Sequence, residues 1–405
     1  MDKIKFSVLL PTRNRLNLLK YAVETVIRQD YDNWEIIISD NYSEENIAAY
    51  VESLNDTRVK YFRTETFVPV TDNWNHALGK SSGDYIIMLG DDDGLMKGSF
   101  RIVSRLIEAH DSPELIYTRA LLYAYPGVLP AFPDGFLSVA GCAEFFKKGE
   151  KPFFLDKKTA VKLVKRSMNF HVSFDYNMQY SIMSRKLISN IGSVKFFQSP
   201  YPDYYATNVA FLKAGRILIS PLPLVTIGIS PKSFGFFYFN QREEEGVEFL
   251  KNIPEPELAD RLGSIMLPGS NMNSSWLLAM ETIRSRYKSE FNLRVNYRRY
   301  RVLQVLHLCQ NYFGLGTVTK AQMKELWRRL STWERISYTT RIFAWFLVER
   351  VFTITSTRRR SIRRVLGLTD PLPDFNPKKS ESRYRNLLEV FEQVEPEAYL
   401  HFAGK

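Results

Sequence analysis

The chain has few of the residue types on which several classes of protein depend. Its 405 residues include two cysteines, Cys142 and Cys309, which are far apart and lack metal-ligand spacing, so no disulfide framework is expected. The five histidines are scattered, which argues against a histidine-based zinc site. No run of about 18 to 20 uninterrupted apolar residues is present, so no membrane-spanning helix is predicted. These absences favour an ordinary globular protein of a reducing compartment.

The amino terminus and the net charge narrow the setting further. Residues 1–5 lead straight into a strand pattern and lack the charged and then apolar order of a secretion signal. We therefore expect a cytoplasmic protein, with contact at the inner face of the membrane left open. The net charge of +11 favours anionic partners such as nucleotide diphosphates or acidic lipid head groups. No recognised motif for nucleic-acid binding accompanies this charge, so nucleic acid is not expected as a partner.

The amino-terminal part alternates between strand and helix patterns. Strands are expected at 4–10, 34–39, 59–62 and 84–89, each of the first three being followed by helical spacing of apolar residues. Pro11 is expected to close the first strand, and Ser43 to cap the helix after the second. Such alternation requires a mostly parallel sheet with right-handed crossovers. The predicted fold class is therefore α/β.

Acidic residues follow two strands of this predicted sheet. Asp40 comes just after the second strand, and Asp91, Asp92 and Asp93 follow the fourth. Because ligands of open α/β sheets collect beyond the carboxyl ends of the strands, these side chains are expected to meet in one crevice. Neighbouring carboxylates repel one another, and a hard cation such as Mn²⁺ or Mg²⁺ would neutralise them and hold a diphosphate. The alternative is an ordinary solvated turn, since Asp and Gly both form turns.

Three segments together resemble the family 2 glycosyltransferases of GT-A fold. They are PTRN at 11–14, EIIISDNYS at 35–43 and NWNHALGKSSGDYIIMLGDDDG at 73–94, and the likeness extends over about residues 4–235. The resemblance implies that Asp40 contacts the nucleotide base, that Asp91 binds the nucleotide sugar, and that Asp92 and Asp93 hold the metal ion. Pro11, Thr12, Arg13 and Asn75 are the other positions expected to bind the nucleotide sugar.

The chain departs from the family pattern at two positions. Gly90 stands where the acidic motif usually begins, so the carboxylate that touches the ion is left open among the three, with Asp92 preferred. Trp74 stands where family members often have an arginine that is expected to contact phosphate. For Arg13 two roles stay open, which are contact with the phosphates and stabilisation of the first loop.

A second region resembles the part of the family that binds the acceptor. In residues 201–225 an acidic residue opens a helix and a strand bounded by glycine follows, while 176–194 resembles the strand and helix that frame the acceptor pocket. The resemblance implies that Asp203 is the base, which removes the proton of the acceptor hydroxyl as the sugar is transferred with inversion. On local sequence alone, the simpler interpretation of Asp203 is a helix cap.

After about residue 240 the alternation stops and the chain becomes helix-rich and basic. We predict three parts: a nucleotide-sugar-binding half at 1–100, an acceptor-binding half at 101–240 and a helical extension at 241–405. Basic residues concentrate at 284–301, and a basic cluster follows an aromatic run within 341–364, which suits contact with an anionic membrane surface. The alternative is a core helix whose arginines form a solvated face.

The combined prediction is a metal-dependent, inverting glycosyltransferase of polysaccharide biosynthesis. Its donor would be a nucleotide diphosphate sugar of UDP, GDP or dTDP type, and its acceptor a glycan or a lipid-linked glycan. A catalytically silent GT-A-like protein that binds sugar nucleotide or membrane and recruits partners is the alternative. A nucleotidyltransferase should have a glycine-rich loop after the first strand, whereas residues 11–15 contain no glycine.

Overall fold

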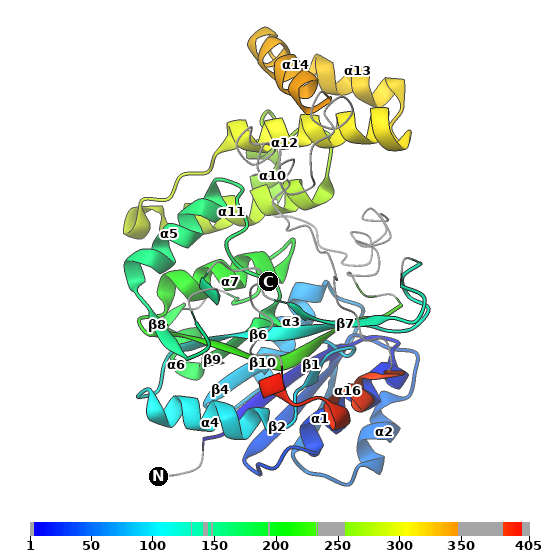
Figure 1. Cartoon of the computed structure of the whole chain (residues 1–405), viewed down its shortest axis with the longest axis vertical. Coiled ribbons are helices and arrows are strands. Elements are labelled where there is room, and N and C mark those ends of the chain that lie inside the picture. The colour runs from blue at the N-terminus through cyan, green and yellow to red at the C-terminus, as the bar shows by residue number, and fades with distance from the viewer. Residues whose placement is uncertain are drawn as a thin grey trace. The chain divides into compact units, whose positions relative to one another are not determined.

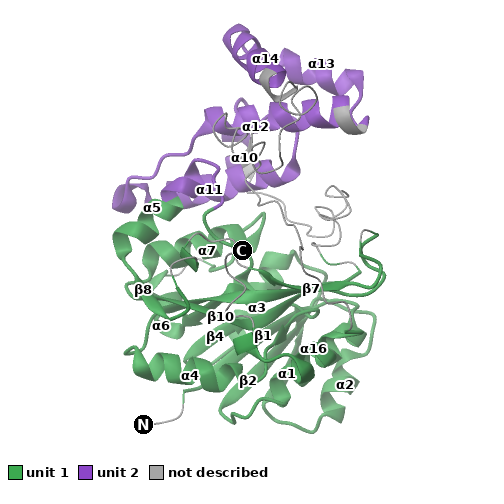
Figure 2. Ribbon diagram, viewed as in Figure 1, with its two compact units in different colours: residues 1–164, 173–252, 375–405 green, residues 165–172, 253–374 purple. Residues whose placement is uncertain are grey.

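The structure is a computed structural model of the chain that describes residues 4–346 and 384–398. Residues 131, 141–144, 147–148, 193–194, 232 and 234–255 are gaps within these ranges. The chain divides into two compact units, coloured in Figure 2. Unit 1 comprises residues 1–164, 173–252 and 375–405, and unit 2 comprises residues 165–172 and 253–374. The boundary predicted at 240–241 lies outside the described residues, and the predicted domain limits stay a prediction.

Unit 1 contains a ten-stranded sheet with strand order β3-β2-β1-β4-β9-β6-β10-β5, to which β7 adds on β6 and β8 on β10. The strands are β1 Phe6–Thr12, β2 Trp34–Asp40, β3 Val59–Arg63, β4 Tyr85–Met88, β5 Gly94–Leu95, β6 Leu115–Ala124, β7 Phe136–Ala140, β8 Phe153–Leu155, β9 Ser181–Ser184 and β10 Ile217–Ile229. The helices are α1 Leu16–Ile27, α2 Ile47–Ser53, α3 Val70–Lys80, α4 Ser99–Ala109, α5 Lys157–Met168, α6 Arg185–Asn190, α7 Pro202–Lys213 and α16 Leu387–Gln393, of which α5 runs on into unit 2.

The amino-terminal half of the sheet is parallel, as the sequence predicts. Strands β3, β2, β1 and β4 pair in parallel, and every residue of β1 and β2 is buried because helices cover the sheet (Figure 1). The register places Thr12 beside Asp40, so the carboxyl ends of β1 and β2 lie at the same edge. The first strand runs on through Pro11 to Thr12 instead of stopping at Pro11, since residues 6–12 all pair with β2. The α/β fold class is confirmed.

Strand β9 joins the two halves of the sheet. It pairs antiparallel with β4 on one side and with β6 on the other, and β10 then continues the sheet parallel to β6. The short helical turn Met178–Tyr180 leads into β9, and α6 follows it. Helix α7 begins at Pro202, a residue suited to the first helical turn, and β10 follows after Gly215. The strand and helix expected in 176–194 and the helix and strand expected in 201–225 are therefore present.

Unit 2 is helical over its described residues. Its helices include α10 Pro256–Leu262, α11 Asn271–Phe291, α12 Tyr297–Gln310, α13 Lys320–Arg328 and α14 Thr332–Phe346, with a π-helical turn at Asn311–Leu315. Their shared core contains Val305, Leu326 and Tyr338. The helical carboxyl-terminal region is confirmed, and the segment 347–364 lies outside the described residues. Among the described helices, none has the length and apolar character needed to cross a membrane.

Candidate active site

The first acidic residue after β4, Asp91, is fully buried and held by the last residue of β1 and by the residue that precedes α1. The hydroxyl of Thr12 donates to Asp91 Oδ2 at 2.7 Å. Arg15 donates from Nε to the same oxygen at 3.1 Å, and its Nη2 forms an ion pair with Oδ1 at 2.6 Å. Burial raises the pKa of Asp91, while the charge of Arg15 opposes the rise. The bidentate contact with Arg15 compensates the charge of this carboxylate.

Asp92 is the member of the triplet with a carboxylate oxygen that accepts no hydrogen bond from the described residues. Ser230, just after β10, donates its hydroxyl to Asp92 Oδ2 at 2.6 Å, and Arg15 Nη1 lies 3.6 Å from the same oxygen. Among the described residues, none donates a hydrogen bond to the other carboxylate oxygen, Oδ1. Arg15 Nη1 is itself buried and has no hydrogen-bond acceptor in the described part of the chain. An anionic oxygen and a cationic donor are thus left available in the same place.

Asp93 has its carboxylate oxygens occupied by protein donors. Oδ2 accepts from the backbone N–H of Gly90 at 2.7 Å and from Gln179 Nε2 at 2.5 Å, and Oδ1 accepts from the backbone N–H of Gly228 at 2.9 Å. Burial and the neighbouring charge of Asp92 raise its pKa. Asp93 therefore joins three segments of the fold, and its assignment as a metal ligand stays a prediction.

The close packing of the triplet explains one departure from the family pattern. A Cβ atom at Gly90 would lie 2.8 Å from Asp93 Oδ2 and 3.1 Å from Asp92 Oδ1. Carbon at the shorter distance would force the Asp93 carboxylate to move. In this chain, glycine at position 90 thus leaves the Asp93 carboxylate in its place, which a larger residue would require to shift.

Asp203 lies at the start of α7, and two adjacent residues, Met178 and Gln179, connect it to Asp93. Its Oδ1 accepts from the backbone N–H of Met178 at 2.8 Å, and the neighbouring residue, Gln179, is the one that contacts Asp93. The side chain is partly exposed. Burial raises the pKa of Asp203 to about 7, against the hydrogen bonds from the backbone of Met178 and of Asp203 itself. Asp203 therefore titrates near neutral pH, and its hydrogen-bond donor Met178 is the chain neighbour of the residue that contacts the triplet.

Asp40 lies on the other side of the cluster, at the end of β2. It is buried, and its carboxylate accepts from the backbone N–H of Ser43 at 2.9 Å and from the hydroxyl of Tyr61 at 2.7 Å. The register of β1 and β2 sets it beside Thr12, which contacts Asp91. Burial, followed by the hydrogen bond to Asp40, raises the pKa of Tyr61. Asp40, the triplet and Asp203 are thus connected at one edge of the sheet.

Three other predicted residues have different surroundings. Pro11 is buried within β1, and the guanidinium of Arg13 stacks over the ring of Phe67 at 3.4 Å. The amide of Asn75 bonds the backbone of Thr71 and of Phe197, and makes no hydrogen bond to an aspartate of the cluster among the described residues.

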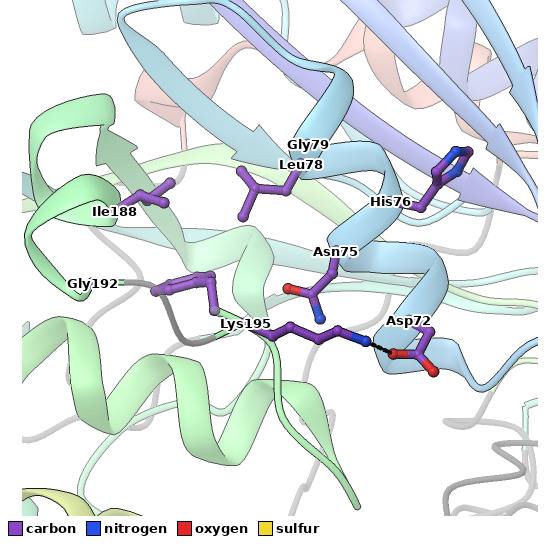
Figure 3. A pocket seen from close by; sticks show the side chains of 9 residues that line it. Asp72, Asn75, His76, Leu78, Gly79, Ile188, Gly192 and Lys195 are labelled. Atoms are coloured by element: carbon purple, nitrogen blue, oxygen red, sulfur yellow. Dashed lines mark hydrogen bonds and ion pairs between the residues drawn. The ribbon is translucent and has the colours of Figure 1, made fainter.

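Asn75 instead lines a separate hollow on unit 1, which has a volume of about 480 Å³ (Figure 3). The lining residues are Asp72, Asn75, His76, Leu78, Gly79, Ile188, Gly192, Lys195 and Phe196. They come from α3, α6 and the segment after α6, and Asp72 and Lys195 form an ion pair of 2.6 Å (Figure 3). None of the aspartates at 40, 91, 92 or 203 lines this hollow.

Four residues of the site were not predicted from the sequence. Arg15, Gln179 and Ser230 contact the triplet directly, as described above. The buried hydroxyl of Tyr125 has no hydrogen-bond partner among the described residues, and burial together with the charges of Asp92 and Asp93 raises its pKa. Arg15 had a usable signal because it closes the turn that holds Thr12 and Arg13. The other three come from distant segments and only meet the cluster once the sheet has formed.

Metal binding by the acidic cluster stays a prediction. No group of three or more His, Cys, Asp or Glu side chains in the described part of the chain could by itself hold a metal ion. Asp92, through its available Oδ1, is the residue that fits. Such a site suits Mg²⁺ or Mn²⁺, which proteins often bind through one or two carboxylates while substrate phosphates and water complete the coordination.

Comparison with known proteins identifies the amino-terminal region. Residues 7–119 match the family model described as glycosyl transferase family 2. A β-1,3-glucosyltransferase of Campylobacter jejuni that acts on GalNAc(5)-diNAcBac-PP-undecaprenol is 37% identical over 98 residues, which are 24% of this chain and 32% of that protein. WcaA of Escherichia coli, a glycosyl transferase named for colanic acid biosynthesis, is 27% identical over 59% of this chain and 81% of that protein.

Other matches extend the comparison. WfgD of Escherichia coli, a UDP-Glc:α-D-GlcNAc-diphosphoundecaprenol β-1,3-glucosyltransferase, is 30% identical over 23% of this chain and 37% of that protein. Among solved structures, TarS of Staphylococcus aureus in complex with UDP-GlcNAc aligns with a TM-score of 0.48 and 14% identity, covering 96% of this chain and 92% of that one. The match over residues 7–119 confirms the resemblance to the family 2 glycosyltransferases that the sequence predicts.

Proposed function

We propose that the protein is a metal-dependent, inverting glycosyltransferase that moves a sugar from a nucleotide diphosphate to a hydroxyl of a lipid-linked glycan. The observation that carries this proposal is the connected set of carboxylates at one edge of the sheet. Asp40 adjoins Thr12, Thr12 and Arg15 hold Asp91, and Gln179 and Met178 link Asp93 to Asp203. In this proposal Asp203 serves the acceptor, the other aspartates serve the donor, and all of them belong to one connected set.

The donor's diphosphate would lie against Asp92 and Arg15. The available oxygen of Asp92 suits a divalent cation, which when bound would stabilise the charge that develops on the leaving diphosphate. Arg15 Nη1 and the hydroxyl of Tyr125 are buried donors without acceptors among the described residues. Because leaving a buried donor unpaired costs about 1–3 kcal/mol, phosphate oxygens near these groups would be favoured. Asp40, at the far end of the cluster, is the group proposed to contact the nucleotide base.

Asp203 is proposed as the base. An acceptor hydroxyl is a poor nucleophile while protonated, and a carboxylate within reach can take its proton as the bond to the anomeric carbon forms. A pKa of about 7 makes Asp203 a stronger base than an ordinary carboxylate while leaving a substantial fraction ionised at neutral pH. One base and in-line attack give inversion of the anomeric configuration, with no covalent sugar intermediate.

The names of the relatives support the proposed acceptor class. Two of them are glucosyltransferases whose stated acceptors are sugars on diphosphoundecaprenol, and one of these has UDP-glucose as its stated donor. Since the matched segments cover a third or so of each relative, the acceptor of this chain is proposed by analogy. A lipid-linked glycan and a UDP-sugar are the first substrates to test.

Nucleotide binding is the first experiment. The thermal unfolding midpoint of the pure protein would be measured with UDP, GDP or dTDP, each with and without Mn²⁺. A ligand that binds only the folded state at about 100 times its Kd adds about 2.7 kcal/mol of stability. We expect one nucleotide to raise the midpoint when Mn²⁺ is present, and Asp92→Asn to lose most of this rise. Equal responses of the Asp92→Asn and wild-type proteins would contradict the role of Asp92.

An assay of sugar transfer distinguishes the role of Asp203 from that of Asp92. With a UDP-sugar and a diphosphoundecaprenol-linked acceptor, Asp203→Asn should lower the transfer rate by at least about 100-fold, as loss of a general base does. Its Mn²⁺-dependent nucleotide binding should stay close to that of the wild type. Transfer at the wild-type rate by Asp203→Asn would exclude Asp203 as the base, and binding without any transfer or donor hydrolysis would favour the catalytically silent alternative.

A further inference from the structure

Helix α14, Thr332–Phe346, has two faces of different character. One face packs into the core of unit 2 through Tyr338, with Ile342 against the same cluster, and Glu334 forms an ion pair of 2.6 Å with Arg301. The opposite face carries Trp333, Ile336 and Phe343, whose exposed fractions are 70%, 67% and 61%. Positions separated by three and seven residues share one side of a helix. Three large apolar side chains therefore share the exposed side of α14, together with the exposed Thr339 and Thr340.

An aligned set of exposed large apolar side chains needs an explanation. Single exposed apolar residues are common, but a contiguous group on one element marks a contact surface. We name Trp333, Ile336 and Phe343 the α14 face. Only three other large hydrophobic side chains are strongly exposed among the described residues, and two of these, Tyr42 and Phe154, belong to unit 1. Exposed apolar area is thus concentrated on this helix.

Basic residues outnumber acidic residues on α14 and the helices next to it in the sequence. Residues 320–346 contain six Lys or Arg and two Asp or Glu. The guanidinium of Arg298 lies 5.7 Å from the ring centre of Trp333. Arg298, Arg335 and Arg341 have no carboxylate partner among the described residues, whereas Arg328 and Arg329 share Glu325. The surroundings of the face therefore have an excess of unpaired positive charge.

We infer that the α14 face docks on an anionic lipid membrane. Trp, Ile and Phe can enter the region between head groups and acyl chains, and flanking arginines can remain with anionic phosphates. Helix α14 has 15 residues and is about 22 Å long, shorter than the roughly 30 Å hydrocarbon core, so it would lie in the plane of the interface.

Charge and composition favour lipid over other occupants. A second copy of this chain would bring the same positive charge to the contact, which opposes association. Nucleic acid would satisfy the arginines but offers little to Ile336 and Phe343. An anionic membrane meets both the apolar and the basic parts. This inference does not depend on the proposed donor, metal ion or base, and can be tested without measuring transfer.

The test is sedimentation of the full chain with lipid vesicles. Vesicles of equal parts phosphatidylglycerol and phosphatidylcholine would be compared with vesicles of phosphatidylcholine alone. We expect the wild type to sediment with the anionic vesicles, and the double variant Trp333→Ser and Phe343→Ser to need at least about tenfold more lipid. Phe154→Ser, which removes an exposed aromatic side chain of unit 1, is the matched control and should bind as the wild type does.

Two further measurements make the outcome decisive. Binding should weaken as salt is raised, because head-group attraction is screened. Thermal unfolding of the double variant should match that of the wild type, since both side chains are exposed. The inference would be overturned if the wild type ignores anionic vesicles, if it binds neutral vesicles equally well, or if a folded double variant binds like the wild type. The inference would likewise be overturned if the wild type forms a dimer that the double variant does not form, and the wild type does not bind vesicles.

Discussion

Asp203 is an acidic residue in a largely buried position, and this makes its ionisation a cost to stability. Its pKa is raised from 3.8 to about 7 by burial, so the folded protein holds a proton that the unfolded chain releases above about pH 4. The favourable contribution of a raised pKa is fully present below the unfolded pKa and is lost as pH rises through the folded one. The free energy of unfolding should therefore fall between about pH 4 and pH 7 because of this group.

This gives a test of Asp203 that is independent of activity. Asp203→Asn keeps an oxygen that can accept from the N–H of Met178 but cannot ionise. We expect the variant to be more stable than the wild type by about 1–2 kcal/mol at pH 8, allowing for partial exposure, and nearly equal at pH 4. Thermal or denaturant unfolding at several pH values measures the difference. A constant difference over this range would show that Asp203 does not titrate as described.

At the same scale, the sequence predicted the acidic residues but missed their partners. Asp91, Asp92 and Asp93 were recognisable because three carboxylates follow an apolar strand. Gln179 and Ser230 carry no such signal, since an isolated Gln or Ser is common anywhere on a surface. They become part of the site only because β9 pairs with β4, and because Gly228 in β10 donates to Asp93. Long-range strand pairing, which one sequence does not display, decided these contacts.

At the scale of the element, α16 shows how a distant segment supports the site. Leu387 and Val390 are buried in the same core cluster as Leu18 of α1. A Cβ atom at Gly94, the residue after Asp93, would lie 2.8 Å from Leu387 Cδ2. A helix of seven residues is not stable in isolation, so α16 depends on this packing. The sequence assigns these residues to the carboxyl-terminal extension, but in the structure they pack in unit 1, next to the residue that follows the acidic triplet.

Removing this contact should destabilise the sheet domain. Leu387→Ala deletes a buried side chain, and we expect it to lower the free energy of unfolding by about 2–4 kcal/mol. Glu392→Ala on the exposed side of α16 breaks an ion pair of 2.6 Å with Arg28 and should cost less than about 1 kcal/mol. Denaturant unfolding followed by near-ultraviolet circular dichroism would measure both. Equal small effects would mean that α16 contributes little to unit 1.

The sequence predicts element boundaries well where the apolar periodicity is strong, and less well where more than one residue could cap a helix. The strands at β1, β2 and β4 were expected within a few residues of their bounds. Ser43 was expected to cap the second helix, but Asn46 caps it by accepting from the N–H of Ala49. Ser43 is engaged elsewhere, since its hydroxyl accepts from the N–H of Asn14 in the β1–α1 turn. A tertiary contact therefore displaced a local capping preference.

At the scale of the whole molecule, two units serve two proposed requirements of one reaction. Unit 1 contains the carboxylates proposed for donor binding and for acceptor activation. Unit 2 contains the α14 face, proposed to hold the protein at a lipid surface. A lipid-linked acceptor confined to that surface would be reached more often by an enzyme that resides there. The contribution of unit 2 should therefore appear as a dependence on how the acceptor is presented.

The double variant Trp333→Ser and Phe343→Ser tests this coupling, which rests on both proposals. With a diphosphoundecaprenol-linked acceptor in anionic vesicles, transfer at limiting acceptor should fall about tenfold, in step with membrane affinity. With the same acceptor dissolved in detergent, the variant and the wild type should transfer at equal rates, because the acidic cluster is unchanged. Asp203→Asn should instead fail in both conditions. If the double variant loses as much activity in detergent as in vesicles, Trp333 and Phe343 act in catalysis or folding and not in membrane contact. If the double variant is as active as the wild type in vesicles, residence at the surface does not limit the reaction.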